Sequence, residues 1–269
     1  LLDFAATKKI DLTIVGGEDP LPLGIVNRFR EKGQKIFGPT AEAAQIETSK
    51  AFAKGIYAES GVPTAQFRVF SSHDEARRYV EDSSTKYPLM VKADGLAAGK
   101  GAVPCFSIAE AKAALHDMMV KKTFKQAGDK VVVEQFLLGR ESSVHTLTDG
   151  KTHKLFPHAW QDHKYIGAGT PESPNGTGLL TGGMGTYGPV PWMTPAEMRR
   201  VDQRSVTPVL EELRRLGIPF EGCLFSGLMT TADGTHYKLE DNARFGAPET
   251  ESLVRQTQNL HELLDAVAT

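Results

Sequence analysis

The chain has 269 residues, of which 24% are charged and 40% hydrophobic, with 31 Lys and Arg against 33 Asp and Glu. A net charge of −2 and a pI near 6.5 argue against a protein that binds nucleic acid mainly by electrostatics. No apolar run approaches the roughly 20 residues of a membrane span, no secretory signal is visible, and two cysteines do not make a disulfide framework. These features favour a soluble cytoplasmic enzyme with more than one domain.

The first part of the chain alternates apolar strands with helices. Residues 12–15 have the pattern of a short buried strand, and residues 22–32 that of a helix that ends at a glycine. A second helix is expected over roughly residues 41–59, because Gly61 stops it. This alternation predicts a mixed α/β fold.

Two short helices and two strands follow. Ser72 and Ser107 each stand three residues before a glutamate, which is the capping-box pattern at the start of a helix. Residues 88–92 and 130–136 are apolar runs bounded by turn residues, and they read as buried strands.

A glycine-rich loop comes directly after the first of these strands. Lys92 leaves the strand, and the loop holds Gly95, Gly99, Lys100 and Gly101. Glycines let backbone N–H groups approach phosphate oxygens closely, and a lysine adds a mobile point charge. The spacing differs from that of a P-loop, so the loop is either a surface feature or a phosphate site of another kind.

The strand over residues 130–136 ends in a mixture of polar and apolar residues. Backbone groups at such an end can bind an adenine edge, and Glu141, seven residues after Glu134, could accept hydrogen bonds from two ribose hydroxyls. The alternative is an edge strand with two solvated glutamates.

A second glycine-rich segment lies further along the chain. Residues 182–185 contain three glycines behind Thr181, which makes a backbone suited to anions. His158 and His163 are five residues apart, a spacing that fits no common zinc pattern.

The last elements are a helix and a hairpin. A helix should begin at Thr194, with a proline at its first position, and end at Gly217. Residues 222–242 then form a hairpin, whose turn contains Asp233 and Gly234.

The second strand of this hairpin carries a candidate metal site. Residues two apart face the same side of a strand, so Glu240 and Asn242 point together. Two oxygen ligands suit Mg²⁺, which completes its shell with phosphates and water. Arg244 continues on that face and could stabilise a transferring phosphoryl group. The alternative is a polar strand that faces solvent.

These segments, in this order, resemble the glycinamide ribonucleotide synthetases (phosphoribosylamine–glycine ligases) of the ATP-grasp superfamily. The strings that carry the resemblance are LTIVG at 12–16, FGPTA at 37–41, SKAF at 49–52, VKADGLAAGKG at 91–101, QDHK at 161–164, TGGMG at 181–185 and NARFG at 242–246. Together they span about residues 11–250.

The resemblance implies an α/β (α+β) architecture, an ATP-grasp fold preceded by the remainder of a Rossmann-like N-terminal domain. It places a partial N-terminal domain at 1–48 and the ATP-grasp domain at 49–269, with a lid subdomain at about 63–133. The family's opening strand and its C-terminal domain are then expected to be missing.

The resemblance also assigns the contacts with ATP. The residues implied to bind the phosphates, the adenine and the ribose are Lys50, Lys92, Lys100, Glu134, Gln135, Phe136, Leu137 and Glu141. Glu240 and Asn242 are implied to hold Mg²⁺ or Mn²⁺.

A further set is implied to form the substrate site. Its members are Glu18, Asp162, Lys164, Gly182, Gly183, Met184, Gly185 and Arg244. Of the residues carried over, Arg244 and Lys92 are implied to be catalytic, because both would lie beside the group that is transferred.

The implied reaction joins glycine to 5-phosphoribosylamine with ATP, giving glycinamide ribonucleotide, ADP and phosphate, the second step of purine synthesis. Because a carboxylate is a poor electrophile, ATP first converts it to an acyl phosphate, which the amine attacks. Cations that stabilise the transferring group suffice, so no covalent nucleophile is needed. The other partners implied are small molecules, with no membrane or nucleic acid.

Several positions depart from the family pattern. Asp241 replaces an aromatic residue and would be costly if it were buried without a partner. Ala247 replaces an aspartate that could bind an ammonium group, Tyr165 stands where arginine is usual, and Gly17 replaces a proline. The loop over residues 166–180 is longer than the family's turn, and the composition of residues 167–178 within it favours local disorder.

These departures leave two alternatives open. The chain could be a nucleotide-binding homologue without ligase activity, or an ATP-grasp ligase for another pair of amine and acid. The oligomeric state cannot be inferred from the sequence.

Overall fold

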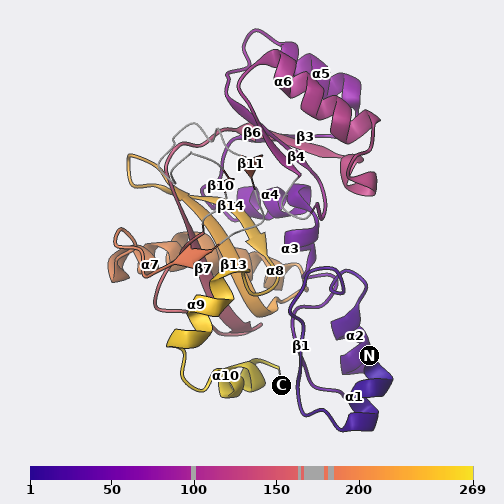
Figure 1. Ribbon diagram of the computed structural model, residues 1–269, viewed down its shortest axis with the longest axis vertical. Helices are drawn as coiled ribbons and strands as arrows, with labels where there is room; N and C mark the ends of the chain where they lie inside the picture. The colour runs from indigo at the N-terminus through magenta and orange to yellow at the C-terminus, as the bar shows by residue number, and fades with distance from the viewer. Residues whose placement is uncertain (98–100, 163–164, 167–178, 181–184, 269) are drawn as a thin grey trace.

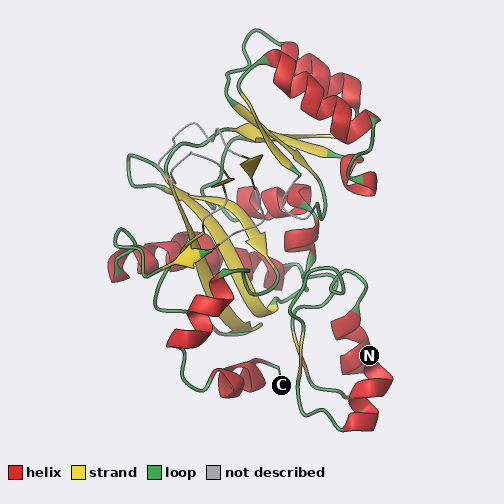
Figure 2. Ribbon diagram, viewed as in Figure 1, coloured by secondary structure: helices red, strands yellow, loops and turns green. Residues whose placement is uncertain are grey.

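The computed structural model describes residues 1–97, 101–162, 165–166, 179–180 and 185–268. A small sheet with two helices lies at one end of the molecule, a larger sheet lies in the middle, and the N-terminal segment forms a separate lobe (Figure 1). The secondary structure is mixed, as the alternation in the sequence predicts (Figure 2).

The N-terminal lobe has two helices and two parallel strands. In chain order these are α1 (Leu2–Lys8), β1 (Thr13–Ile14), α2 (Ile25–Glu31) and β2 (Ile36–Phe37). Helix α2 begins three residues later than predicted, because Gly24 precedes it with a φ of 74°, in the left-handed region.

The single helix predicted over residues 41–59 is two helices, α3 (Gln45–Thr48) and α4 (Lys50–Glu59). Ser49 between them is extended, and its hydroxyl accepts a hydrogen bond of 3.1 Å from the Phe52 amide. The serine therefore works as an N-cap, which begins a new helix instead of continuing the old one.

The small sheet is antiparallel, with strand order β3-β6-β4-β5. Its elements are β3 (Phe67–Phe70), α5 (His73–Glu81), β4 (Leu89–Ala93), β5 (Ala102–Cys105), α6 (Ile108–Leu115), a π turn (His116–Val120), a 3₁₀ turn (Lys125–Gly128) and β6 (Val131–Gln135). Ser72 and Ser107 cap α5 and α6, which confirms both predicted helix starts. Helices α5 and α6 cover one face of the sheet, which leaves the other face toward the larger sheet (Figure 1).

The larger sheet is also antiparallel, with order β14-β13-β7-β8. Its strands are β7 (Arg140–Asp149), β8 (His153–Leu155), β13 (Glu221–Thr230) and β14 (His236–Asn242). Strands β13 and β14 form the predicted hairpin. A register shift opposite Gly227 and Leu228 makes Leu239 an extra residue in β14.

The helix predicted from Thr194 to Gly217 contains a π turn. Thr194 caps α7 (Pro195–Val201), which runs through the π turn (Asp202–Val206) into α8 (Thr207–Arg215). Pro208 has no N–H to donate to the preceding turn, which accounts for the widened backbone just before it.

The remaining elements are short. Strand β9 (Gln161–Asp162) pairs with β12 (Thr186–Tyr187), and β10 (Tyr165–Ile166) pairs with β11 (Leu179–Leu180). Two helices follow β14, α9 (Glu249–Gln256) and α10 (Leu260–Val267). The segment over residues 167–178, predicted to be disordered, lies outside the described residues. Within the described ranges no helix has the length and apolar character to cross a membrane.

Two neighbouring connections join the small sheet to the larger one. In the connection that leads into the small sheet, Thr64 forms a β-bridge with Lys238 of β14, and the Lys238 amide donates to the Pro63 carbonyl at 2.7 Å. In the connection that leads back to the larger sheet, Gly139 lies so close to Thr230 of β13 that an added Cβ would be 2.2 Å from the Thr230 carbonyl oxygen. Only glycine fits there.

Candidate nucleotide and substrate site

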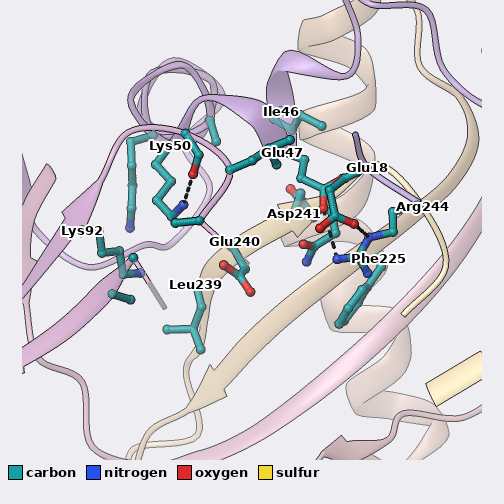
Figure 3. Close-up of a pocket in the computed structure, with 18 of the residues that line it drawn as sticks. Glu18, Ile46, Glu47, Lys50, Lys92, Phe225, Leu239, Glu240, Asp241 and Arg244 are labelled. Atoms are coloured by element: carbon teal, nitrogen blue, oxygen red, sulfur yellow. Dashed lines mark hydrogen bonds and ion pairs between the residues drawn. The ribbon is translucent and has the colours of Figure 1, made fainter. Parts of the chain in front are cut away.

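A cavity of about 430 Å³ lies between the two sheets. Its walls come from the N-terminal lobe, α3, α4, β4, the loop after β4, and β13 with β14. Figure 3 shows Lys50 and Lys92 on one side, Glu240 between them and the opposite wall, and Arg244 with Glu18 and Glu47 on that wall. The structure thus brings together predicted residues from four distant segments.

The lysine side of the cavity is built around one buried carboxylate. Glu134 of β6 forms ion pairs with Lys92 Nζ through Oε1 at 2.5 Å and with Lys54 Nζ through Oε2 at 2.6 Å. Burial favours the neutral carboxyl, but the two lysines outweigh it and lower the pKa of Glu134. Burial lowers the pKa of Lys92, yet the charges of Glu134 and Glu240 outweigh it and raise that pKa.

Lys50 begins α4 and reaches across to the loop after β4. Its Nζ donates to the Gly95 carbonyl at 3.1 Å, and burial lowers its pKa. Asp94 fixes the same junction, because its Oδ1 accepts hydrogen bonds from Ser49 Oγ at 3.0 Å and from the Ala51 amide at 2.9 Å. The start of α4 and the start of the glycine-rich loop are therefore tied together.

Strand β14 supplies the predicted metal ligands. Glu240 and Asn242 are partly exposed and line the cavity. Because Leu239 is the extra residue of the bulge, Lys238 and Asp241 share the opposite, buried side of the strand.

Asp241 is buried but not unpaired. It accepts hydrogen bonds from Ser226 Oγ at 2.6 Å and from Lys238 Nζ at 2.8 Å. Burial and the Asp241 charge together raise the pKa of nearby Tyr57 well above its usual range. The charge that Asp241 brings in place of an aromatic residue is thus neutralised by Lys238. The free-energy cost of an unpaired buried charge therefore does not arise.

Arg244 lies between two carboxylates. Its Nε donates to Glu18 at 2.9 Å, and its Nη2 lies 3.3 Å from Glu47 Oε1. The other oxygen of Glu47 accepts a hydrogen bond of 2.8 Å from the Ala243 amide. Burial raises the pKa of Glu47 to about 7, although Arg244 opposes the shift. The two glutamates fix the guanidinium at the cavity wall.

A buried carboxylate remains near the altered position 247. Ala247 and Glu249 both line the cavity, and Glu249 is 1% exposed. The neighbouring Gly246 amide donates to His145 Nε2 at 3.1 Å, and burial lowers the pKa of His145 to about 3. His145 is therefore neutral and accepts a hydrogen bond beneath the substrate end of the cavity.

Other predicted site residues are not brought into this cavity. Gln135 is exposed at the end of β6, Phe136 lies against Phe106 at 5.8 Å between ring centroids, and Glu141 lies on β7. The hinge residues 134–137 and Glu141 are not among the described residues that line the cavity, so their contact with ATP stays a prediction. The Glu134 carboxylate is engaged by two lysines.

The glycine-rich substrate segment is only partly described. Asp162 lies in β9, where its backbone pairs with Thr186, and Gly185 is half-buried just before β12. The predicted site residues outside the described ranges are Lys100, Lys164, Gly182, Gly183 and Met184.

The donor set of the cavity fits a hard cation that a polyphosphate helps to bind. Within the described ranges no cluster of three or more His, Cys, Asp or Glu side chains could hold a metal alone. Mg²⁺ usually takes one or two protein oxygens and fills its shell with phosphate and water. The carboxylate of Glu240 and the amide of Asn242 fit that need.

Comparison with known proteins identifies the family. Residues 48–250 match the model of the phosphoribosylglycinamide synthetase ATP-grasp (A) domain, and residues 1–47 match that of the N domain. The chain belongs to the phosphoribosylglycinamide synthetase family. The predicted ATP-grasp fold is thereby confirmed.

Curated relatives agree with this assignment. A phosphoribosylamine–glycine ligase of Chlorobaculum tepidum is 46% identical over 267 residues, which cover 99% of this chain and 60% of the relative. The Escherichia coli K12 enzyme is 43% identical over 264 residues, with 98% and 59% covered. The chain thus spans about 60% of the length of these relatives.

Solved structures place the fold in the same group. The crystal structure of phosphoribosylamine–glycine ligase from Thermotoga maritima matches with a TM-score of 0.74 at 30% identity, covering 88% of this chain and 56% of that one. A biotin carboxylase of Campylobacter jejuni has a TM-score of 0.76 at 15% identity, with 99% and 56% covered, and shares the fold.

The cavity residues of this synthetase-family chain that the sequence reasoning did not name include Lys54 and Glu47. Lys54 lies four residues after Lys50, and that helical spacing was the available signal that both share a face. Glu47 stands between a buried isoleucine and a helix break, and no local pattern distinguishes it from a solvated glutamate.

Proposed function

We propose that this chain is the nucleotide-binding and catalytic part of a phosphoribosylamine–glycine ligase. The observation that supports this most is the cavity whose lysine wall faces a wall bearing Glu240, Asn242 and Arg244. The arrangement matches what a polyphosphate and a carboxylate need when they react with each other.

The proposed reaction has two steps. A glycine carboxylate oxygen attacks the γ-phosphorus of ATP, the bond to the bridging oxygen breaks, and ADP leaves. The amine nitrogen of 5-phosphoribosylamine then attacks the acyl carbon, phosphate leaves, and the nitrogen loses a proton. The product is glycinamide ribonucleotide.

The chain's own residues supply positioning and charge in both steps. Lys50 and Lys92 hold the polyphosphate against the small sheet, while Arg244 holds the carboxylate that is phosphorylated. Glu18 and Glu47 fix the arginine in place. Such preorganised cations stabilise the transition state without reorganisation at the moment of reaction.

Glu240 and Asn242 would hold the divalent cation, which we propose to be Mg²⁺ or Mn²⁺. When bound, this ion neutralises negative charge on the transferring phosphoryl group. Family membership supports the use of ATP and a divalent cation, and the oxygen ligands favour these two ions over softer metals.

One observation favours a second candidate, a ligase of the same fold with another amine or acid. Ala247 lines the cavity where the family pattern has an aspartate. A smaller, uncharged side chain there would admit an acid larger than glycine. The family assignment also predicts a cytoplasmic location and partners that are all small molecules.

The test is product analysis on the chain as it exists, with ATP, Mg²⁺, glycine and freshly prepared phosphoribosylamine. We expect ADP and glycinamide ribonucleotide in equal amounts, both dependent on glycine. Parallel reactions with alanine and serine test the second candidate. If ATP binds in a titration but no acid yields a product, the ligase proposal is wrong and the chain only binds nucleotide.

A further inference from the structure

The Glu134 carboxylate is shared between two lysines that have different surroundings. All three side chains are buried, with Glu134 3%, Lys54 2% and Lys92 7% exposed, but Lys92 lies near the end of β4 at the base of the glycine-rich loop, whereas Lys54 lies in α4. Both ion pairs are close, at 2.5 and 2.6 Å. The group therefore has one positive charge more than it has negative charges.

Lys54 lines the cavity, but its ammonium is engaged by contacts within the protein. Its Nζ donates to Thr64 Oγ1 at 2.6 Å, and that hydroxyl donates in turn to the Lys238 carbonyl at 2.8 Å. The ammonium also lies 5.6 Å from the ring centre of Phe67. These contacts direct the ammonium toward the hairpin connection and Glu134 instead of toward a phosphate.

The charge of Lys54 has a consequence for Lys92. A carboxylate paired with Lys92 alone would neutralise it, and an anion in the cavity would then meet a dipole instead of a cation. With Lys54 on its second oxygen, Glu134 is already compensated. The burial of Lys54 lowers its pKa to about 8, so the side chain is still protonated at neutral pH.

We propose that Lys54 is a positioning residue that compensates Glu134 and thereby leaves the charge of Lys92 available to a polyphosphate. The proposal rests on the proposed function, in that the cavity is taken to bind a nucleotide. It makes the affinity for phosphates depend on the net charge of the three side chains, whatever the identity of each.

A set of variants separates this role from a structural one. Lys54→Met lowers the net charge by one, Glu134→Gln raises it by one, and the double variant restores the original value without either native side chain. Lys121→Met makes the same change as Lys54→Met at an exposed lysine that pairs with Asp117, and it serves as a control.

The measurement is the dissociation constant for ATP, ADP and adenosine, by calorimetric titration of folded protein at fixed Mg²⁺. We expect Lys54→Met to weaken ATP about ten- to a hundredfold, as for loss of a charge-assisted contact, and to leave adenosine within about threefold. Glu134→Gln should bind ATP at least as tightly as the parent, and the double variant should return to within about threefold of the parent.

The outcomes decide between the ideas. If ATP and adenosine weaken equally in Lys54→Met, or if Glu134→Gln weakens ATP as strongly, then Lys54 has only a structural role. Should Lys54→Met not fold, the ATP-to-adenosine ratios of Glu134→Gln and the double variant still test the dependence on charge. A parent chain that binds no ATP would instead count against the proposed function.

Discussion

The two walls of the cavity keep buried charge in different ways. On the small-sheet wall, Glu134 is paired with lysines from two other elements, and positive charge is in excess. On the β14 wall, Asp241 is neutralised by Lys238, three residues away on the same strand. The first wall carries an excess of positive charge and suits a polyphosphate, whereas the second wall carries the proposed metal ligands Glu240 and Asn242 on the strand that holds the neutralised pair.

The comparison also distinguishes buried charges that matter for stability from buried charges that matter for ligand binding. The local pair on β14 can be exchanged as a unit, because both partners lie on one strand. We expect that the three-residue group on the lysine wall cannot be exchanged in this way, because we propose that its charge serves a ligand. The predictions below test this distinction in order of expected effect.

The largest effect is expected when the local pair is broken. Lys238→Met leaves Asp241 buried without its counter-ion and should lower the free energy of unfolding by about 3–5 kcal/mol. The double variant Lys238→Met/Asp241→Leu removes both charges and should recover most of that loss. Urea denaturation of the three chains measures the effect, and a double variant no more stable than the single one contradicts an exchangeable pair.

Removing the carboxylate of Glu240, the proposed metal ligand, should affect turnover more than binding. Glu240→Gln should lower glycine-dependent ATP turnover by about a hundred- to a thousandfold, because charge stabilisation of the transferring group is lost. Adenosine affinity should change little. The exposed Glu251→Gln is the matched control, and normal turnover of Glu240→Gln at limiting Mg²⁺ would rule it out as a ligand.

Lys92 of the lysine wall should matter more than Lys100, which the sequence alone predicts to lie in the glycine-rich loop. Lys92→Ala should weaken ATP about ten- to a hundredfold, since Lys92 is fixed by β4 and Glu134. Lys100→Ala should weaken it several times less, because a loop lysine is more easily replaced by water. Equal affinities in a nucleotide titration would show that β4 gives Lys92 no advantage.

Near neutral pH the smallest effect is a pH dependence of stability that comes from His145 of β7 and grows as the pH falls. The pKa of His145 falls from 6.5 unfolded to about 3 folded, so its contribution to stability is present above pH 6.5 and is lost toward pH 3. The loss should be about 1.4 kcal/mol per pH unit within that window. The free energy of unfolding of His145→Gln, measured against pH, should lack this part of the slope, whereas the control at the exposed His261, His261→Gln, should keep it. Parallel curves for the parent and both variants would exclude a contribution from His145.

Local patterns predicted a good part of this structure. The caps at Ser72 and Ser107 and the hairpin were readable because each depends on residues a few positions apart. The shared direction of Glu240 and Asn242 followed from strand periodicity alone.

What the sequence did not reveal depends on partners far along the chain. Lys54 and Glu134 form an ion pair although 80 positions separate them, and Glu47 accepts a hydrogen bond from the Ala243 amide, 196 positions away. The bulge at Leu239 could not be predicted either, since a bulge is defined by the neighbouring strand. The break at Ser49 was missed because a serine inside an apolar helical pattern caps only if the chain turns there.

The paired connections between the sheets bring the two attachments of the small sheet side by side. The small sheet is anchored at Thr64 and Gly139, which contact the adjacent strands β14 and β13. A body held at two neighbouring points rotates most easily about the line that joins them, as in a hinge. Such a rotation would swing Lys92 toward or away from Glu240, and the Lys54–Glu134 contact would act as the strut that limits its travel.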